Sequence, residues 1–428
     1  MKALVTRKLG KIAHGLVARY KPQVVAVTGS VGKTSTRTAI ALALGSTHTV
    51  RTPYKNYNNE IGVPLAILGE KSPGKNAWEW LKLIWRAKKI KGLPAYLVLE
   101  YGADRPGDLA YLSAIACPNV AVITAISSVH VGNYPNFEAL IEEKASLGDK
   151  VEKGGLVLLN ANDQFVKLMR GRYEAQVMTF GVGEGDVYAT DLELVTPKEE
   201  SFDIGEVFAV TRFTVKTPDD EVVVELKNCV GEALVRSAVA GIAVASYYRV
   251  PLADAATAIS EGFTAVAGRL RPLAGIKGSL ILDDSYNAAP ASMIAGLETL
   301  KMFTPGEEWD RHVAVLGDMA ELGGMSEAEH RAVGRKVAET ADVALFVGPE
   351  MRYAMEEAEA AGMARDKMEW FASAEDAGRY LDANLEKGDV VYVKGSQSQR
   401  MEKVVKDVMA EPLRAADLLV RQEPQWLE

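Results

Sequence analysis

Residues 28–34, with the sequence Thr-Gly-Ser-Val-Gly-Lys-Thr, constrain this chain more than any other segment. They follow an apolar run at residues 24–27 and precede a helical pattern at residues 35–44. A strand, a glycine turn and a helix start make a phosphate cradle, because glycine lets backbone N–H groups approach anionic oxygens and the helix N-terminus adds partial positive charge. Lys33 is placed to reach terminal phosphates, and the Thr34 hydroxyl suits Mg²⁺. The segment therefore predicts a nucleotide-phosphate site.

The spacing of the two glycines narrows the class of nucleotide-binding protein. A standard phosphate loop reads GxxxxGK[ST], whereas this one reads GxxGKT, which indicates a narrower group of ATP users. The alternative is a glycine turn without function, and the preceding strand together with the GKT run disfavours it. The residues predicted to contact ATP are Gly29, Ser30, Gly32, Lys33, Thr34 and Ser35.

Composition excludes several classes of protein. The chain has 428 residues, enough for about three domains. Its 48% hydrophobic and 25% charged content is typical of a globular protein with a large core. The net charge of −8 disfavours nucleic-acid binding, which needs a basic surface. The two cysteines, Cys117 and Cys229, supply neither a disulfide framework nor a metal-type spacing, which indicates a reducing cytosol.

The apolar runs are too short for a membrane-spanning helix. None reaches the roughly 20 residues that a transmembrane helix requires. The basic stretch at residues 1–21 is interrupted by Lys11 and His14 and lacks the apolar region of a signal peptide. We therefore expect a cytoplasmic protein.

Strand-like and helical segments alternate in two parts of the chain, which predicts mainly parallel sheets covered by helices. The predicted strands are 24–27, 96–99, 120–124 and 156–160 in the first part and 280–282, 313–316, 343–347 and 390–393 in the second. Between the two parts, residues 187–228 alternate polar and apolar side chains, and we interpret them as an antiparallel flap on the first domain.

The expected fold class is therefore α/β. Residues 1–22 form a short basic helix, and residues 23–270 form a central P-loop-type ATPase domain with a mainly parallel sheet and the antiparallel flap. Residues 271–428 form a Rossmann-like α/β C-terminal domain. Two such units joined near residues 268–272 are expected to close over a nucleotide.

Residues 77–91 are rich in tryptophan and in basic side chains, and they hold three of the six tryptophans. The side chains predicted to share one helical face are Ala77, Trp80, Leu81, Ile84 and Lys88. A basic aromatic amphipathic helix is able to lie on an anionic membrane as a peripheral contact. A surface helix packed on the sheet edge is the alternative, and it is favoured because amphipathicity is what any surface helix shows.

Polar side chains follow several predicted strands, where ligands of nucleotide-binding sheets lie. Glu100 ends an apolar strand and is placed to hold Mg²⁺ with Thr34. His130 follows the next strand and is a candidate ligand. Lys144 lies in a predicted helix at 137–150, and by itself it is interpreted as a solvated lysine. The polar groups at 283–287 and 394–396 each have a simple loop interpretation, but together they fit a cleft.

Taken together, these segments resemble the Mur ligase family, and within it the MurF type. The matching segments are TGSVGKTST (28–36), NYNNEIGVP (56–64), LEYGADRPGDLAYL (99–112), SSVH (127–130), GR (268–269), DDSYNAAPASM (283–293), LGDMAELG (316–323), SEAEHRAVG (326–334) and VKGS (393–396). They occur in family order and cover about residues 23–405. The segments EYGADRPGD, DDSYNA and GDMAELG favour the MurF type over its relatives.

The resemblance implies an ATP-dependent ligase of peptidoglycan precursor synthesis. A carboxylate of a UDP-N-acetylmuramoyl tripeptide attacks the γ-phosphate of ATP, and D-alanyl-D-alanine then attacks the resulting acyl phosphate. Lys33 and Mg²⁺ would neutralise the developing charge. The small-molecule substrates would be a nucleotide-sugar peptide and a D-amino-acid dipeptide, and the enzyme would act as a monomer.

The resemblance also implies roles for individual residues. Thr34 and Glu100 would hold a first Mg²⁺, and His130 a second, supported by a carbamylated Lys144. The catalytic residues would be Lys33, His130 and Lys144. Two residues of the closing domain, Arg269 and Asp284, would contact phosphate and ribose. The residues implied near the substrates are Asn58, Asn59, Tyr286, Asn287, Ser292 and Lys394.

Three departures from the family pattern keep other functions open. Only 22 residues precede the nucleotide strand, where the family has a UDP-sugar-binding domain. Gly231-Glu232-Ala233-Leu234 replaces a Gly-x-His-Asn run that contacts adenine, and Ala289 replaces an asparagine. A ligase with a lipid-linked or non-muramoyl acceptor, and a non-catalytic nucleotide-binding subunit, are therefore alternatives. The zinc-containing amidating relative needs four cysteines, and this chain has two.

Overall fold

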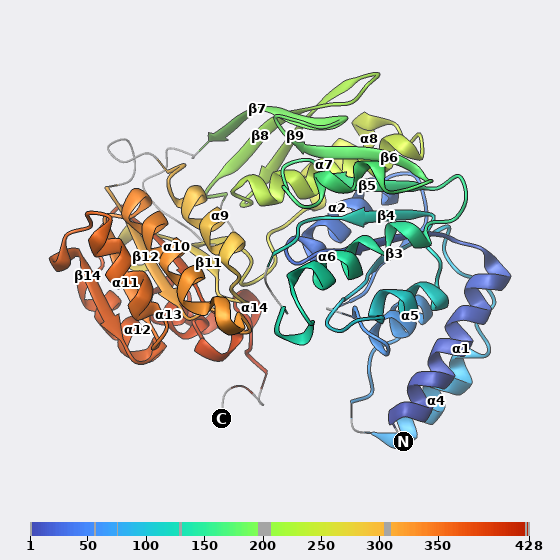
Figure 1. Ribbon diagram of the computed structural model, residues 1–428, viewed down its shortest axis with the longest axis horizontal. Coiled ribbons are helices and arrows are strands. Elements are labelled where there is room, and N and C mark those ends of the chain that lie inside the picture. The colour runs from blue at the N-terminus through green and yellow to red at the C-terminus, as the bar shows by residue number, and fades with distance from the viewer. Residues whose placement is uncertain are drawn as a thin grey trace.

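The computed structural model describes residues 2–54, 57–74, 76–127, 131–195, 207–303, 310–423 and 426. Two sheets dominate it, one of nine strands and one of six, and helices flank both (Figure 1). The predicted α/β class is therefore confirmed. Among the helices of the described residues, none is long and apolar enough to cross a membrane.

The nine-stranded sheet is built around β1, whose neighbours β3 and β4 run parallel to it. The strand order is β2-β3-β1-β4-β5-β6-β7-β8-β9. Pairing is parallel as far as β7 and antiparallel from β7 to β9, as the predicted flap requires. The strands are β1 (Gln23–Thr28), β2 (Val50–Arg51), β3 (Tyr96–Glu100), β4 (Val120–Ile123), β5 (Leu156–Asn160), β6 (Gln176–Val182), β7 (Val187–Val195), β8 (Val210–Lys216) and β9 (Glu221–Lys227).

Successive side chains of β1 point into two different cores. Val25 and Val27 pack with one set of helices, whereas Val24 and Ala26 pack with another. Burial on both faces explains why the strand is continuously apolar. On the first face lie α2 (Lys33–Gly45), α7 (Glu232–Tyr247) and α8 (Leu252–Gly262), and on the second lie α1 (Lys2–Tyr20), α3 (Gly62–Leu68), α5 (Asp108–Ile115) and α6 (Phe137–Ala145).

The six-stranded sheet has the order β10-β11-β15-β12-β13-β14. Only its edge strand β10 is antiparallel among these pairs. Its strands are β10 (Arg271–Ala274), β11 (Leu280–Asp284), β12 (Arg311–Gly317), β13 (Val343–Val347), β14 (Met368–Phe371) and β15 (Asp389–Lys394). One face is covered by α9 (Pro290–Leu300), α10 (Ser326–Thr340) and α11 (Met351–Ala360), and the other by α12 (Ala374–Asn384), α13 (Glu402–Val408) and α14 (Ala415–Leu418).

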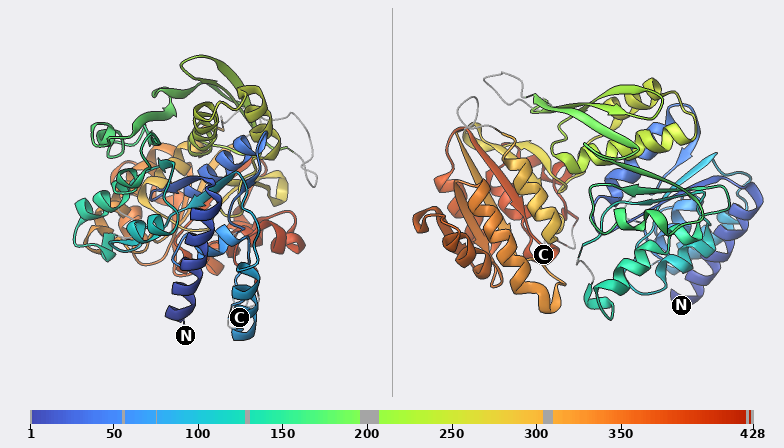
Figure 2. Two further views of the ribbon diagram at one scale, coloured as in Figure 1. Left: turned by 90° about the vertical axis from the view of Figure 1, so that its right-hand side faces the viewer. Right: turned by 45° about the horizontal axis from the view of Figure 1, so that its top comes forward.

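The tryptophan-rich segment forms α4 (Ala77–Ala87), whose first turn is capped by the Asn76 side chain. Leu83 and Ala87 of α4 pack with Leu9 of α1 and Leu65 of α3. The segment therefore packs on two helices, and not on the sheet edge that the sequence interpretation named. In Figure 1 and in the right-hand view of Figure 2, α1 lies at the end of the molecule away from the six-stranded sheet.

Candidate functional site

The phosphate loop lies between β1 and α2, in a backbone shape that only glycine tolerates. Gly29 has φ 141°, and a Cβ placed there would lie 2.1 Å from the Thr124 hydroxyl oxygen. Gly32 has φ 86° and is the N-cap residue of α2. The Ser30 amide donates to the Ala125 carbonyl at 2.6 Å, which fixes the loop against the end of β4. The loop is therefore a narrow backbone cradle at the start of a 13-residue helix.

Two lysine amines meet at this loop. The Lys33 Nζ donates to the carbonyl oxygens of Gly29 and Ser30, at 2.8 and 3.2 Å. The Lys144 Nζ, from α6, donates to the same Gly29 oxygen at 3.3 Å. Burial lowers the pKa of Lys33, and burial together with the charge of Lys33 lowers the pKa of Lys144 to about 7. A large fraction of the Lys144 amine is therefore neutral at physiological pH.

Oxygen donors gather beside the loop at the end of β3. The Thr34 hydroxyl donates to Glu100 Oε2 at 2.9 Å, and the Asn58 amide donates to Oε1 at 3.2 Å. The Glu100 side chain is buried. Hydroxyl and carboxylate oxygens are the donors that Mg²⁺ prefers, so the pair fits a Mg²⁺ ion shared with phosphate oxygens. A compact carboxylate–hydroxyl pair beside a phosphate cradle suits phosphoryl transfer.

Arg37 was missed by the sequence analysis. Its guanidinium lies 3.6 Å from Glu100 Oε2 and is buried. Burial lowers its pKa, and the charge of Arg269 lowers it further. The signal was present in the sequence, because position 37 lies one helical turn after Thr34 and so shares its face of α2.

Asn59 has a local structural role. Its side-chain oxygen accepts from the backbone amides of Ile61 and Gly62, at 3.2 and 2.9 Å, at the start of α3. Of these two neighbouring asparagines, Asn58 is the one that bonds to Glu100 in the part of the chain that the structure describes. Their predicted role toward substrate stays a prediction.

The six-stranded sheet presents a second polar cluster at the ends of β11 and β15. The Lys394 ammonium pairs with Asp284 Oδ2 at 2.6 Å and donates to the Asn287 carbonyl at 2.9 Å. The Tyr392 hydroxyl also donates to Asp284, at 3.2 Å. Asp284, Asn287 and Lys394 are thus brought together by the parallel pairing of their strands.

Arg269 and Tyr286 lie where the chain enters the second unit. The guanidinium carbon of Arg269 is 4.6 Å from the centre of the Tyr286 ring. The Tyr286 amide donates to the Gly268 carbonyl at 3.0 Å, which holds the turn after β11 against the segment that precedes β10. The positive charge of Arg269 contributes, after burial, to the lowered pKa of Lys33. The two units therefore share one electrostatic environment around the phosphate loop.

The loop that holds Tyr286 is braced by the C-terminal segment, which the sequence analysis also missed. The buried Arg421 guanidinium donates to the Ser285 carbonyl at 3.1 Å and to the Tyr286 carbonyl, and it pairs with Glu402 at 2.8 Å. No local pattern points to this contact, because Arg421 and Tyr286 are 135 residues apart.

Ser292 has a local structural role. Its hydroxyl accepts from the Ala289 amide at 3.1 Å and donates to the Ala289 carbonyl, so it caps the start of α9.

The predicted second metal ligand, His130, lies outside the described residues. Within the described part of the chain, no group of three or more His, Cys, Asp or Glu side chains has metal-site geometry. A Mg²⁺ held by Thr34 and Glu100 would need further oxygen donors, which phosphate and water supply.

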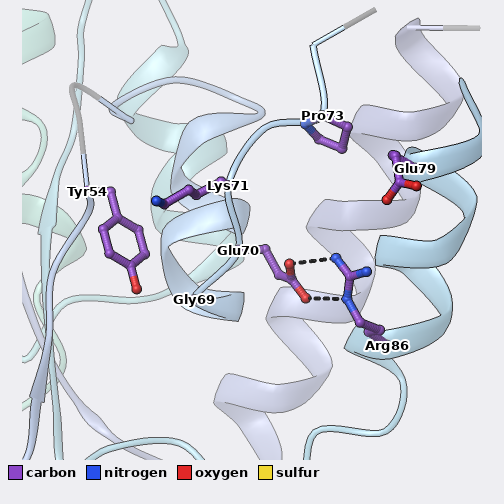
Figure 3. A pocket seen from close by; sticks show the side chains of 7 residues that line it. All are labelled: Tyr54, Gly69, Glu70, Lys71, Pro73, Glu79 and Arg86. Carbon is purple, nitrogen blue, oxygen red and sulfur yellow. Dashed lines mark hydrogen bonds and ion pairs between the residues drawn. The ribbon is translucent and has the colours of Figure 1, made fainter. Parts of the chain in front are cut away.

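A separate hollow lies away from the phosphate loop, beside α4 (Figure 3). Its volume is about 320 Å³, and its lining includes Tyr54, Lys71 and the ion pair between Glu70 and Arg86. None of the phosphate-loop residues lines it. It therefore has no part in the nucleotide site.

Comparison with known proteins agrees with this geometry. Residues 27–245 match the Mur ligase middle domain, and residues 268–397 match the Mur ligase, glutamate ligase domain. The UDP-N-acetylmuramoyl-tripeptide–D-alanyl-D-alanine ligase of Bacillus subtilis is 28% identical over 405 residues, which are 95% of this chain and 80% of that protein. The ligase of the same name from Mycobacterium bovis is 31% identical over 338 residues, which are 78% of this chain and 60% of that protein.

A solved structure extends the similarity to three dimensions. The MurF ligase from Thermotoga maritima in complex with ADP has a TM-score of 0.75 and 26% identity, and the match covers 94% of this chain and 83% of that one. The matched domains include both polar clusters described above. This chain therefore belongs to the Mur ligase family and is of the MurF type.

Proposed function

We propose that this chain is an ATP-dependent ligase that joins D-alanyl-D-alanine to a UDP-N-acetylmuramoyl tripeptide in the cytoplasm, in peptidoglycan precursor synthesis. The observation that carries the proposal is the arrangement of Lys33, Thr34 and Glu100 around one phosphate cradle. The names of the similar enzymes from Bacillus subtilis and Mycobacterium bovis support the choice of substrates. The working form is a monomer.

ATP would bind with its phosphates on the backbone of Gly29, Ser30, Gly32 and Ser35. In this position the start of α2 and the Lys33 ammonium face the anionic oxygens. Thr34 and Glu100 would hold a first Mg²⁺, which when bound neutralises charge on the phosphoryl group. The ammonium of Lys33 stabilises the charge that develops as the γ-phosphoryl group is transferred.

Lys144 would become a carbamate. The ammonium first releases one proton. The neutral amine then attacks the carbon of CO₂, the N–C bond forms as one C=O π bond opens to an oxyanion, and the nitrogen releases a second proton, so the side chain changes from a cation to an anion. The pKa of about 7 supports this step, because it leaves a nucleophilic amine at neutral pH. The carbamate and His130 would support a second Mg²⁺. Conversion to an anion would also remove the repulsion between Lys144 and Lys33.

The second unit would close over the nucleotide and the substrates. Arg269 and Asp284 would contact phosphate and ribose, and Lys394 holds Asp284 in place through their ion pair. The remaining predicted substrate contacts are Asn58, Asn59, Tyr286, Asn287 and Ser292. Closure would exclude water from the acyl phosphate and so protect it from hydrolysis.

The reaction then balances in two steps. A carboxylate oxygen of the tripeptide attacks the γ-phosphorus, the bond to the bridging oxygen breaks, and ADP leaves. The amino group of the dipeptide attacks the acyl carbon, the C–O bond breaks, phosphate leaves and one proton is released. Each step brings an electron-rich nucleophile to a centre flanked by negative charge, which explains the need for Lys33, Arg269 and the metal.

Phosphate release from ATP tests the proposal, with the tripeptide nucleotide and D-alanyl-D-alanine each omitted in turn. We expect release only when both are present, together with a pentapeptide product identified by mass. Binding of ATP and Mg²⁺ without release would instead favour another acceptor, and a screen of lipid-linked and sugar-free peptides would follow. Absence of turnover with every acceptor would favour a non-catalytic subunit.

A further inference from the structure

Helix α4 has two apolar faces, and the part of the chain that the structure describes covers only one of them. Its inner face, which includes Leu83 and Ala87, packs on α1 and α3. Its outer face holds Trp78, Leu81 and Trp85, whose exposed fractions are 75%, 58% and 61%. A contiguous exposed apolar patch rimmed by polar residues is typical of an interaction site, whereas scattered apolar side chains are not. The outer face is therefore a candidate docking surface.

The three exposed side chains form a continuous stripe. Trp78, Leu81 and Trp85 are three and four residues apart, which places them on one side of a helix. The sequence analysis placed Leu81 on one helical face with Trp80 and Ile84, and the buried side chains of α4 are Leu83 and Ala87. Leu81 instead completes the outer stripe between the two tryptophans.

Lysines flank the stripe. One of them, Lys82, lies within α4, and two more, Lys88 and Lys89, come directly after its last residue. The Lys89 ammonium lies 3.2 Å from the centre of the Trp85 ring. Residues 76–95 contain five Lys or Arg and one acidic residue, and residues 1–22 contain six Lys or Arg and no acidic residue. In a chain with a net charge of −8, this end of the molecule is locally positive.

The stripe is held on a rigid support. The Arg86 guanidinium makes two bonds to the Glu70 carboxylate, at 3.0 and 2.8 Å (Figure 3). Asn76 caps the helix, and the Trp80 indole donates to the Gly74 carbonyl at 3.0 Å. The helix is therefore formed before any partner arrives, and docking does not require it to fold.

We propose that this face of α4, with Trp78, Leu81 and Trp85 at its centre and Lys82, Lys88 and Lys89 around it, docks the protein on an anionic lipid bilayer. Indole rings favour the boundary between headgroups and acyl chains, and ammonium groups favour anionic headgroups. Charge complementarity selects the bilayer over an apolar protein groove. The proposal goes beyond the ligase reaction, because α4 contributes no residue to the nucleotide site described above.

Vesicle flotation tests the proposal with the full chain. Vesicles of phosphatidylcholine alone are compared with vesicles containing about one third phosphatidylglycerol. We expect the protein to float with the anionic vesicles and to stay unbound with the neutral ones. Failure to float with the anionic vesicles at low salt would overturn the proposal.

Variants separate insertion from simple charge attraction. Trp78→Ala combined with Trp85→Ala is expected to weaken anionic-vesicle binding by about tenfold or more. The matched control, Leu168→Ala with Leu413→Ala, removes two other exposed side chains and should bind like the parent. Lys82→Glu with Lys89→Glu is expected to abolish binding, whereas Lys153→Glu with Lys387→Glu leaves most of it.

Two results contradict docking on a bilayer. Vesicle binding that the tryptophan variant leaves intact would mean that the aromatic stripe does not enter the membrane. A parent protein that self-associates in solution through Trp78 and Trp85, shown by sedimentation of parent and variant, would identify a protein occupant instead. Because both tryptophans are exposed, the variant should keep the parent's melting temperature, which verifies that it is folded.

Discussion

The side-chain nitrogens of Lys33 and Lys144 converge on one atom, the carbonyl oxygen of Gly29, at 2.8 and 3.3 Å. Lys144 is buried and Lys33 is partly buried, and burial together with the charge of Lys33 lowers the pKa of Lys144. Lys33 belongs to the phosphate loop, and Lys144 comes from a helix more than a hundred residues later. The contact therefore couples the nucleotide cradle to the protonation state of the Lys144 amine on α6.

Replacement of Lys33 should abolish turnover. Lys33→Ala removes the ammonium that faces the transferred phosphoryl group, and we expect kcat to fall by about 10³-fold. Phosphate release under saturating substrates measures the change. The exposed Lys153→Ala is the control and should keep parental activity. A Lys33→Ala enzyme that retained more than about a tenth of the activity would show that the loop does not act as proposed.

Replacement of Lys144 should be partly reversible by a small acid. Lys144→Ala removes the proposed carbamate, and added acetate supplies a carboxylate of similar charge to the vacated space. We expect activity to rise with acetate concentration in this variant and to stay flat in Lys33→Ala. A ¹³C NMR signal from labelled bicarbonate should appear in the parent and be lost in the variant. No rescue and no signal together would leave the carbamate without support.

The unmodified Lys144 also gives stability a defined pH dependence. Its pKa is about 7 in the folded chain, against an ordinary value of 10.5. Between these values the unfolded chain keeps a proton that the folded chain has released, so the free energy of unfolding rises with pH, by at most about 1.4 kcal/mol per pH unit. Urea unfolding of the parent and of Lys144→Met, without bicarbonate, isolates this effect. Identical pH profiles for the two proteins would contradict it.

Glu100 should govern the metal requirement. Glu100→Gln keeps the shape of the side chain but removes the charge that faces Thr34. We therefore expect the Mg²⁺ concentration that gives half-maximal activity to rise by about tenfold or more. A Mg²⁺ titration of phosphate release measures this. Glu79→Gln, on the exposed side of α4, serves as the matched control. An unchanged Mg²⁺ titration would place the metal elsewhere.

Arg421 should matter for stability because its ion pair with Glu402 is buried. Arg421→Met leaves Glu402 partly uncompensated, and we expect a loss of roughly 3 kcal/mol in the free energy of unfolding. Adding Glu402→Gln should recover part of that loss. The exposed pair between Arg414 and Glu411 is the comparison, and Arg414→Met should cost less than about 1 kcal/mol. Equal losses from the two single variants would argue against a structural role for the C-terminal segment.

Much of the fold was predictable because its central strands are buried on both faces. The apolar run at residues 24–27 is typical of a strand at the centre of a parallel sheet, and β1 lies there. Short edge strands carry no such signal. β2 has two residues, and β14 is partly exposed, so the predicted strands omitted both.

The site was predictable only where local rules apply. Glu100 ends β3, and Thr34 lies in the first turn of the helix that follows the neighbouring parallel strand β1, so both lie at the same edge of the sheet. Lys144 lacks a local signal, because a lysine on a helix normally faces water, and only the packing of α6 against the loop buries it. The contact of Arg421 with Tyr286 depends on the path of the whole C-terminal unit.

The acyl-phosphate route is the central claim, and oxygen transfer tests it most directly. The tripeptide nucleotide is prepared with ¹⁸O in its free carboxylates, and the phosphate released with ATP, Mg²⁺ and D-alanyl-D-alanine is analysed by mass spectrometry. The account predicts one heavy oxygen in each phosphate, because the attacking carboxylate oxygen leaves with it. Phosphate without heavy oxygen, formed together with pentapeptide, would contradict the route.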